Sequence, residues 1–248
     1  MNSRIILATI NARFQHAAFG LRYLYANLGE LQEYTQLQEW SLGVRERDVV
    51  EQIVAMDPDI VGFSVYIWNV EEITRVVQML KRLSPETVIV VGGPEVSFEW
   101  EDTALFQDAD YLVRGEGEVA FAELCREVLQ GRRPTEKVRA GGLPELPKLS
   151  WPYPHYSDFD LKHGRIVYVE ASRGCPFQCH FCLSSLDKQV RAFPLDEFLE
   201  QMDILMSRGV LKFKFVDRTF NLKQATSNRI LSFFLERYRE GMFLHFEM

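Results

Sequence analysis

Residues 59–93 read DIVGFSVYIWNVEEITRVVQMLKRLSPETVIVVGG, and this stretch decides the fold. A continuous apolar run, Asp59–Val65, opens it, and a β-branched run, Thr87–Val91, closes it. Both runs have the length and composition of buried strands. The segment between them predicts a helix whose apolar face carries Ile73, Val76, Val77 and Leu80. A strand, a helix and a second strand in this order predict two parallel strands joined by a crossover helix.

The same alternation extends to both sides of this stretch, over residues 1–131. Short apolar runs predict further strands at Arg4–Ile10, Leu37–Trp40 and Asp110–Val113. Segments of helical period predict further helices at Ala18–Leu31, Arg45–Met56, Ser97–Phe106 and Glu118–Leu129. Five strands with crossover helices predict an α/β domain built on a doubly wound parallel sheet, with the flavodoxin-like strand order 2-1-3-4-5. Ligands of such sheets bind beyond the carboxyl ends of the strands.

Two further segments follow this first domain. Residues 132–165 hold five of the ten prolines, which predicts an ordered linker with little regular structure. Residues 166–248 then resume the alternation and predict a second α/β domain. Its expected elements are strands at Ile166–Ser172, Leu211–Val216 and Phe243–Glu247 and helices at Leu195–Ser207 and Leu222–Tyr238. Three strands cannot close a barrel, so we expect a truncated part of a longer protein.

The overall composition restricts the classes of function. The chain carries 28 Lys and Arg residues against 35 Asp and Glu residues, a formal charge of -7. This balance argues against nucleic acid as the main partner, because nucleic-acid-binding proteins usually carry a basic excess. No apolar run reaches the roughly 18–20 residues that span a bilayer, and the N-terminus lacks the features of a secretory signal. We therefore expect a cytoplasmic protein with no membrane partner.

Three of the four cysteines fall in one segment, residues 173–182, which reads RGCPFQCHFC. The C-x3-C-x2-C spacing of Cys175, Cys179 and Cys182 places three thiols on a tight loop after a predicted strand. Thiolates hold iron–sulfur clusters, usually four to a cluster, so three of them leave one iron open to another ligand. A Cys3His zinc site is the alternative. Its histidine would come from His180, His163 or His155.

With Phe181 just before the last cysteine, this segment resembles the signature of the radical S-adenosylmethionine (SAM) superfamily. The resemblance implies a [4Fe–4S] cluster on Cys175, Cys179 and Cys182, whose open iron binds the amino and carboxylate groups of SAM. It also implies a reductase, such as flavodoxin or ferredoxin, whose electron cleaves SAM to a 5′-deoxyadenosyl radical. The family's aromatic residue at the position of Phe181 lies near the adenine. Packing against the loop is the alternative role for Phe181.

Residues 1–131 resemble the cobalamin-binding domain that precedes many radical SAM domains. The resemblance rests on three segments at predicted strand ends, GFSVY (62–66), VVGGPE (90–95) and VRGEGE (113–118). It implies that cobalamin is lined by Ser64, Tyr66, Gly92, Gly93, Pro94, Glu95, Gly115, Glu116, Gly117 and Glu118. Glycines let the backbone approach a flat ligand, and hydroxyl groups bond its polar substituents. A tight strand-to-helix turn is the alternative reason for the two adjacent glycines.

The loop after the first strand departs from the pattern of cobalamin mutases and methionine synthase. Those proteins carry Asp-x-His-x-x-Gly there, and the histidine binds cobalt, whereas residues 11–20 of this chain read NARFQHAAFG. His16 is a candidate cobalt ligand, and a surface histidine is the alternative. Two further possibilities stay open: cobalamin bound without a protein axial ligand, and a vestigial domain that binds no cobalamin.

Acidic residues at predicted strand ends are the remaining candidates in the second domain. Asp217 lies in KFVDRTFN (214–221), which resembles the Phe-x-Asp-Asp-x-Phe segment of cobalamin-type radical SAM proteins, with Arg218 in place of a second Asp. We expect Asp217 to position SAM or a neighbouring loop; a helix N-cap is the alternative. Glu247 is a further candidate to face SAM, and Glu170 is a candidate to support the cysteine loop.

Together these resemblances predict a cobalamin-dependent radical SAM enzyme, with residues 166–248 as the first part of a (β/α) partial TIM barrel. The implied chemistry is methylation of an unactivated carbon in a small-molecule or biosynthetic-intermediate substrate. One alternative is a radical SAM enzyme with a vestigial cobalamin domain that carries out methylthiolation, cyclisation or rearrangement. A non-enzymatic corrinoid or redox sensor is the other.

Overall fold

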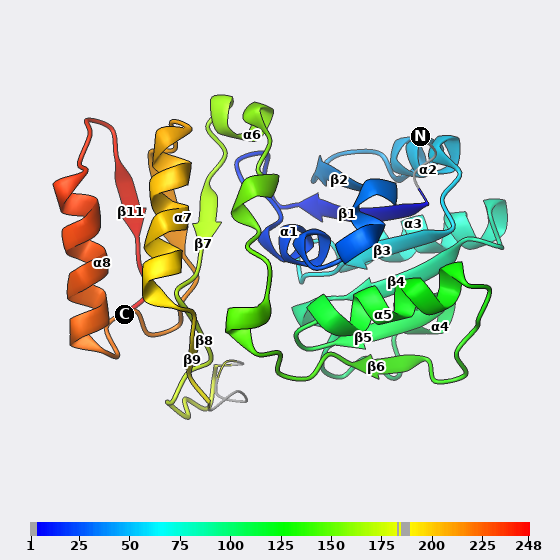
Figure 1. Ribbon diagram of the computed structural model, residues 1–248. Helices are drawn as coiled ribbons and strands as arrows, with labels where there is room; N and C mark the ends of the chain where they lie inside the picture. The colour runs from blue at the N-terminus through cyan, green and yellow to red at the C-terminus, as the bar shows by residue number, and fades with distance from the viewer. Residues whose placement is uncertain (1–3, 183, 185–188) are drawn as a thin grey trace. The chain divides into compact units, whose positions relative to one another are not determined.

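The computed structural model describes residues 4–182, 184 and 189–248 of the chain, and it divides them into two compact units (Figure 1). The first unit comprises Met1–Pro144 and Leu149–His155. The second comprises Glu145–Lys148 and Tyr156–Met248. The segment that the sequence assigns to a linker is thus shared between the two units, and each unit is described by itself.

A parallel sheet of six strands forms the centre of the first unit, in the order β2-β1-β3-β4-β5-β6. Its strands are β1 (Ile5–Asn11), β2 (Thr35–Ser41), β3 (Ile60–Ser64), β4 (Val88–Gly92), β5 (Tyr111–Arg114) and β6 (Val138–Ala140). All neighbouring pairs run parallel. The predicted order 2-1-3-4-5 is therefore confirmed, with β6 added at the edge beyond β5.

Helices cover both faces of this sheet (Figure 1). They are α1 (Phe19–Ala26), α2 (Glu46–Met56), α3 (Val70–Leu83), α4 (Ala104–Asp108) and α5 (Glu118–Leu129), with the short 3-10 turns η1 (Gly29–Tyr34) and η2 (Pro94–Val96). Successive side chains of a strand point to opposite faces. Accordingly Ile6 of β1 packs with α2, α3 and α4, whereas Leu7 packs with α1 and α5. The unit is an α/β sandwich with a buried core on each side of the sheet.

Three local predictions for the first unit are wrong. The helix expected to reach Leu31 ends at Ala26, because Gly29 adopts a φ of 59° and the chain continues as a 3-10 turn. The helix expected over Ser97–Phe106 is reduced to the short α4, which starts only at Ala104. Residues 138–140, expected in a linker of little regular structure, pair with β5 as β6.

The second unit is built on a parallel sheet of three strands in the order β11-β10-β7. Its elements are α6 (Asp158–Lys162), β7 (Val167–Val169), α7 (Leu195–Ser207), β10 (Lys212–Phe215), α8 (Gln224–Glu236) and β11 (Phe243–His245). A two-stranded antiparallel ribbon, β8 (Ser172–Arg173) with β9 (Arg191–Ala192), closes the base of the loop that follows β7. The predicted alternation of strands and helices is confirmed. Within the described parts of both units, no helix is long and apolar enough to cross a bilayer.

Candidate functional site

The carboxyl ends of the first unit's strands form an apolar edge. Each of these strands is followed within a few residues by a large hydrophobic side chain that is exposed. They are Phe14, Leu42, Ile67, Trp68, Phe98, Val119 and Leu143. Single exposed hydrophobic side chains are ordinary on protein surfaces. Several of them at one edge of a sheet are typical of a surface that binds a ligand or a partner protein. It is also the edge at which parallel sheets bind their ligands.

The loop after β3 carries two predicted residues, Ser64 and Tyr66. The Ser64 carbonyl accepts a hydrogen bond from Thr9 Oγ1 at 2.8 Å, which joins the ends of β3 and β1. The Tyr66 ring stacks on Trp68 with centroids 4.4 Å apart and ring planes 7° apart. Burial raises the pKa of the Tyr66 hydroxyl, against a lowering by its hydrogen bond with Ser64. The phenol is therefore neutral, and its ring forms a flat aromatic stack with Trp68.

Asn69 organises this loop, although it is not among the predicted site residues. Its fully buried side chain donates from Nδ2 to the Ile10 carbonyl at 2.9 Å and to Thr9 Oγ1 at 3.2 Å. Its Oδ1 accepts from the Tyr66 backbone N–H at 2.8 Å. One amide thus fixes the loop after β3 to the end of β1. An asparagine just before a predicted helix signals a cap, but its long-range partners leave no trace in the sequence.

The two glycines at the end of β4 lie close to protein backbone. A Cβ atom on Gly93 would lie 2.5 Å from the Val65 carbonyl oxygen, and Gly93 has a φ of 113°. A Cβ atom on Gly92 would lie 3.1 Å from the Val113 carbonyl oxygen. The next two residues, Pro94 and Glu95, begin the 3-10 turn η2. The geometry therefore gives Gly93 the tight-turn role.

Ser97 ties the loop after β4 to the loop after β5. Its Oγ donates to the Gly93 carbonyl at 2.8 Å and accepts from the Gly115 backbone N–H at 3.3 Å. Its carbonyl accepts from Arg114 Nε at 2.9 Å. Sequence reasoning placed Ser97 in a helix and so missed this function.

The segment Gly115–Glu118 is also crowded by the chain that leaves β6. A Cβ atom on Gly141 would lie 1.9 Å from the Glu116 carbonyl oxygen, so only glycine fits there. Gly117 is less confined, with a Val113 side-chain atom 3.2 Å from its hypothetical Cβ atom. Glu118 begins α5 and is buried. The structure thus brings the three predicted loops together at one edge of the sheet.

The cysteine loop leaves the carboxyl end of β7 through the ribbon β8–β9. Gly174 turns the chain with a φ of 89°. Cys175 is buried at the base, Cys182 is half-buried, and Cys179 is exposed at the tip. The Cys182 backbone N–H donates to the Cys179 carbonyl at 3.0 Å, which closes a turn. All four cysteines of the chain lie in its described part, and none forms a disulfide.

The described side chains of this loop do not form a ready metal site. Among the described residues, no three His, Cys, Asp or Glu side chains converge in an arrangement that would hold an ion. The zinc alternative gains nothing either, since His155 packs on Tyr25 and His163 on Phe159, while His180 is exposed. Phe181 is 95% exposed, so its ring does not pack against the loop. Residues 183 and 185–188, which follow the last cysteine, lie outside the described residues.

Asp217 holds the base of the cysteine loop. Its buried carboxylate accepts from the Ala171 backbone N–H at 3.0 Å and from Ser172 Oγ at 2.7 Å. Burial raises the pKa of the Asp217 carboxyl, and the hydrogen bonds from Ser172 and Ala171 oppose the rise. Asp217 lies two residues beyond the end of β10, so it links the end of that strand to the exit of β7. Of its two expected roles, the positioning of a neighbouring loop is the one the geometry displays.

The other acidic candidates make ion pairs. Glu170 pairs with Arg173 at 2.8 Å, with the Arg173 side chain partly buried, next to the start of the cysteine loop. Glu247 pairs with Arg218 at 3.3 Å between the ends of β11 and β10. His16, in the loop after β1, is half-buried.

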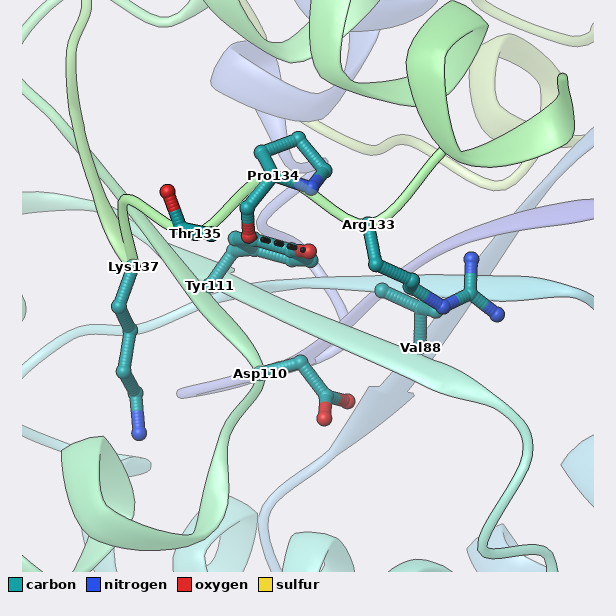
Figure 2. Close-up of a pocket in the computed structure, with 7 residues that line it drawn as sticks. All are labelled: Val88, Asp110, Tyr111, Arg133, Pro134, Thr135 and Lys137. Atoms are coloured by element: carbon teal, nitrogen blue, oxygen red, sulfur yellow. Dashed lines mark hydrogen bonds between the residues drawn. The ribbon is translucent and has the colours of Figure 1, made fainter. Parts of the chain in front are cut away.

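A small cavity of about 260 Å³ lies at the opposite, amino edge of the first sheet (Figure 2). It is lined by Val88, Asp110, Tyr111, Arg133, Pro134, Thr135 and Lys137. Its polar groups serve the fold: Tyr111 donates to the Pro134 carbonyl at 3.1 Å, and Asp110 accepts from Lys81 and from the Ile89 backbone N–H. None of the predicted site residues lines this cavity.

The chain is similar to proteins of known family. A family model described as the B12 binding domain matches residues 5–125, from the start of β1 into α5. The chain is 29% identical to an uncharacterized methyltransferase, PH0819, of Pyrococcus horikoshii, in an alignment that covers 90% of this chain and 52% of the relative. It is 31% identical to the cobalamin-dependent radical SAM methyltransferase TokK of Streptomyces tokunonensis, over 51% of this chain and 22% of TokK.

A solved structure shares the fold of nearly the whole chain. The radical SAM methyltransferase TsrM from Kitasatospora setae, with cobalamin and a [4Fe–4S] cluster bound, matches with a TM-score of 0.67 and 20% identity. The match covers 95% of this chain and 51% of TsrM. The chain thus spans about half the length of PH0819 and TsrM. Residues 5–125 therefore match the B12-binding domain family, in a chain whose relatives include a cobalamin-dependent radical SAM methyltransferase.

Proposed function

We propose that this chain is part of a radical SAM enzyme that uses cobalamin to transfer a methyl group to an unactivated carbon. The observation that carries the proposal is the cysteine loop, with three thiols in eight residues, at the carboxyl end of β7. Residues 5–125 of the same chain match the B12-binding domain family. The curated relatives named as methyltransferases support methyl transfer.

The donor set of the cysteine loop fits an iron–sulfur cluster. Cys175, Cys179 and Cys182 offer three thiols on one loop without disulfides, and thiolates are the usual ligands of such clusters. When bound, the cluster and SAM supply a 5′-deoxyadenosyl radical, and cobalamin supplies a methyl group. The protein orients these groups and keeps water away from them. The buried contacts of Asp217 and Arg173 hold the base of the loop for that purpose.

The exposed parts of the loop leave room for SAM and for an electron donor. The Phe181 ring is almost fully exposed and is the aromatic surface on which the adenine would stack. A flavodoxin- or ferredoxin-type reductase is the proposed source of the electron. The proposed substrate is a small molecule or a biosynthetic intermediate.

The apolar carboxyl edge of the first unit fits a large flat macrocycle. Ile67 and Trp68 expose hydrophobic surface beyond β3, and Phe14 does so beyond β1. Cofactor sites combine such apolar walls with a few polar groups. Ser64 and Tyr66 stand at the same edge and would supply hydrogen bonds to the polar substituents of cobalamin.

Anaerobic reconstitution tests the proposal. We expect about four irons per chain after incubation with iron and sulfide, retention of added cobalamin, and 5′-deoxyadenosine when SAM and a reductant are supplied. The longest available form of the protein should be used, because its relatives are about twice as long. Bound zinc without 5′-deoxyadenosine would overturn the proposal. Radical cleavage of SAM without cobalamin retention would instead favour cyclisation, methylthiolation or rearrangement.

A further inference from the structure

The loop between β1 and α1, residues 12–17, stands at a special place in the first sheet. The chain passes from β1 to β2 on one side and then crosses to β3 on the other side of β1. The loops after β1 and β3 therefore diverge, and such a switch point is where open parallel sheets bind ligands. The loop carries the exposed Phe14 and the half-buried His16.

One carboxylate closes both ends of this loop. Glu39, from the neighbouring strand β2, accepts through Oε2 from Asn11 Nδ2 and from the Ala18 backbone N–H, each at 2.7 Å. Asn11 ends β1, and Ala18 precedes the first residue of α1. The two residues that border the loop are thus bound to one side-chain oxygen.

The second oxygen of Glu39 is neutralised by an arginine from α1. Glu39 Oε1 lies 2.8 Å from Arg22 Nη2, and the two side chains are only 8% and 3% exposed. Arg22 Nη1 donates to the Ala18 carbonyl at 3.0 Å. Ala18 has no side chain that could cap α1, so the carboxylate from β2 satisfies a free N–H of the helix and faces the positive end of its dipole.

A buried ion pair of this kind is a poor source of stability, because both charges lose their hydration. What it supplies here is a single conformation for a loop of six residues. The loop on the other side of the switch point is fixed in the same manner, since Asn69 binds Tyr66 to the end of β1. The loops after β1 and β3, which flank the expected ligand site, are thus both held in place by buried side chains.

We infer that Glu39 is a positioning residue for the corrin ring of cobalamin, through its hold on residues 12–17. The inference rests on the proposed function for the identity of the ligand. It assigns a role in binding to a buried residue that none of the predicted site loops contains. A site held in its bound form before the ligand arrives binds more tightly, because less ordering entropy is lost on binding.

Cobalamin titration of three variants tests the inference. Glu39→Gln keeps the shape of the side chain but removes its charge, and we expect affinity to fall about 10-fold, because a loop that is no longer held must be ordered on binding. Glu39→Leu combined with Arg22→Met leaves no lone buried charge, so it is expected to fold, with some loss of stability because Asn11 and the Ala18 N–H lose their acceptor, and still to bind weakly. Glu30→Gln, at an exposed ion pair of the same unit, is the control and should bind as the wild type does.

Limited trypsin digestion measures the order of residues 12–17 separately from the stability of the whole unit. Arg13 is exposed within the loop. We expect faster cleavage after Arg13 in both Glu39 variants at temperatures where the thermal unfolding curves of variant and control coincide. If the variants are cleaved faster but the wild type binds no cobalamin, the proposed function is refuted. The structural claim that Glu39 holds residues 12–17 would still stand. Wild-type affinity in both Glu39 variants would overturn the inference while cobalamin binding stands.

Discussion

The loop after β1 and the cysteine loop after β7 both leave the carboxyl ends of parallel strands, but they are held in different ways. Glu39 binds both ends of residues 12–17. The cysteine loop is held at its base, where Asp217 binds Ala171 and Ser172. At its tip Cys179 is exposed and Phe181 is 95% exposed.

This difference separates two strategies for building a cofactor site. Buried polar side chains complete the first edge without any ligand. In the cysteine loop, the described thiols do not converge by themselves. A bound metal would therefore have to bring them into their final arrangement. Metal binding then contributes folding free energy to the loop, as it does in small metal-dependent domains. The predictions below test whether the two loops differ in this way.

The largest effect is expected at the tip of the cysteine loop. Cys179→Ala removes a proposed cluster ligand at an exposed position. We expect iron content after reconstitution to fall from about four per chain to background and 5′-deoxyadenosine to disappear. Thermal unfolding of the metal-free chain should not change, and cobalamin retention should be that of the wild type. Measured iron near the wild-type level would contradict the assignment of Cys179.

Hydrogen exchange of the same preparations sharpens the contrast. Reconstitution should slow amide exchange in residues 174–182 and leave exchange in residues 12–17 unchanged, because only the cysteine loop depends on the metal for order. The Cys179→Ala variant, treated identically, is the control and should show no protection. Slow exchange in residues 174–182 before metal is added would mean that the two loops are equally preformed.

The next effect concerns the protein-built edge of the first unit. Gly93→Ala places a Cβ atom 2.5 Å from the Val65 carbonyl oxygen at a φ of 113°. The backbone strain costs about 1–2 kcal/mol and the clash about 1–3 kcal/mol, so the free energy of unfolding should fall by about 2–5 kcal/mol. Gly43→Ala, at the same edge with a φ of 94° and no atom within 4 Å of its Cβ position, is the matched control. It should cost only the strain of about 1–2 kcal/mol.

Denaturant unfolding followed by tryptophan fluorescence measures both variants. All four tryptophans, Trp40, Trp68, Trp100 and Trp151, belong to the first unit, so this signal reports on that unit alone. Equal losses in Gly93→Ala and Gly43→Ala would show that the contact with Val65 relaxes easily.

A smaller effect depends on pH and on Asp217. Burial raises the pKa of this carboxyl in the folded protein, so the native state keeps a proton that the unfolded chain, with an ordinary pKa near 3.9, has lost. The stabilising contribution is complete below about pH 3.9 and is lost as the pH rises through the raised folded-state value. Asp217→Asn cannot lose a proton, so it should remove this decline.

Far-UV circular dichroism at several pH values follows both units, whereas tryptophan fluorescence follows only the first. The change caused by Asp217→Asn should therefore appear in the dichroism and not in the fluorescence. An unchanged pH dependence of the dichroism midpoint would mean that the carboxyl is ionised in the folded protein with an ordinary pKa.

Local periodicity was enough to predict most of the fold. The bounds predicted for α3 (Val70–Leu83), α5 (Glu118–Leu129) and α7 (Leu195–Ser207) match the structure, because each carries a clear apolar face. Features that depend on only a few residues were not predicted. β6 is an edge strand of three residues whose only support is its pairing with β5. The end of α1 depends on the φ of a single glycine, Gly29.

The residues that organise the site were harder to predict than the residues that end the strands. Strand ends follow from the positions of the strands, so Ser64 and Gly92 could be placed at one edge from the sequence. Glu39 and Asn69 act through partners that lie about 20 to 60 positions away along the chain. No local pattern encodes such contacts; they exist only once the order of the strands is known.

The smallest effect is expected at the fourth cysteine. Cys125 is fully buried in α5, within the core that α1 and α5 form with the sheet. Burial raises the pKa of its thiol far above the ordinary value, and only the thiolate is an effective ligand or nucleophile. Cys125→Ala should therefore leave the iron content and the yield of 5′-deoxyadenosine unchanged and cost about 1 kcal/mol of stability, the average for a point substitution. Alkylation of the folded, metal-free chain should modify Cys179 first and Cys125 only after unfolding. A loss of iron in Cys125→Ala comparable with that in Cys179→Ala would make Cys125 a cluster ligand and remove the open iron on which the proposed binding of SAM depends.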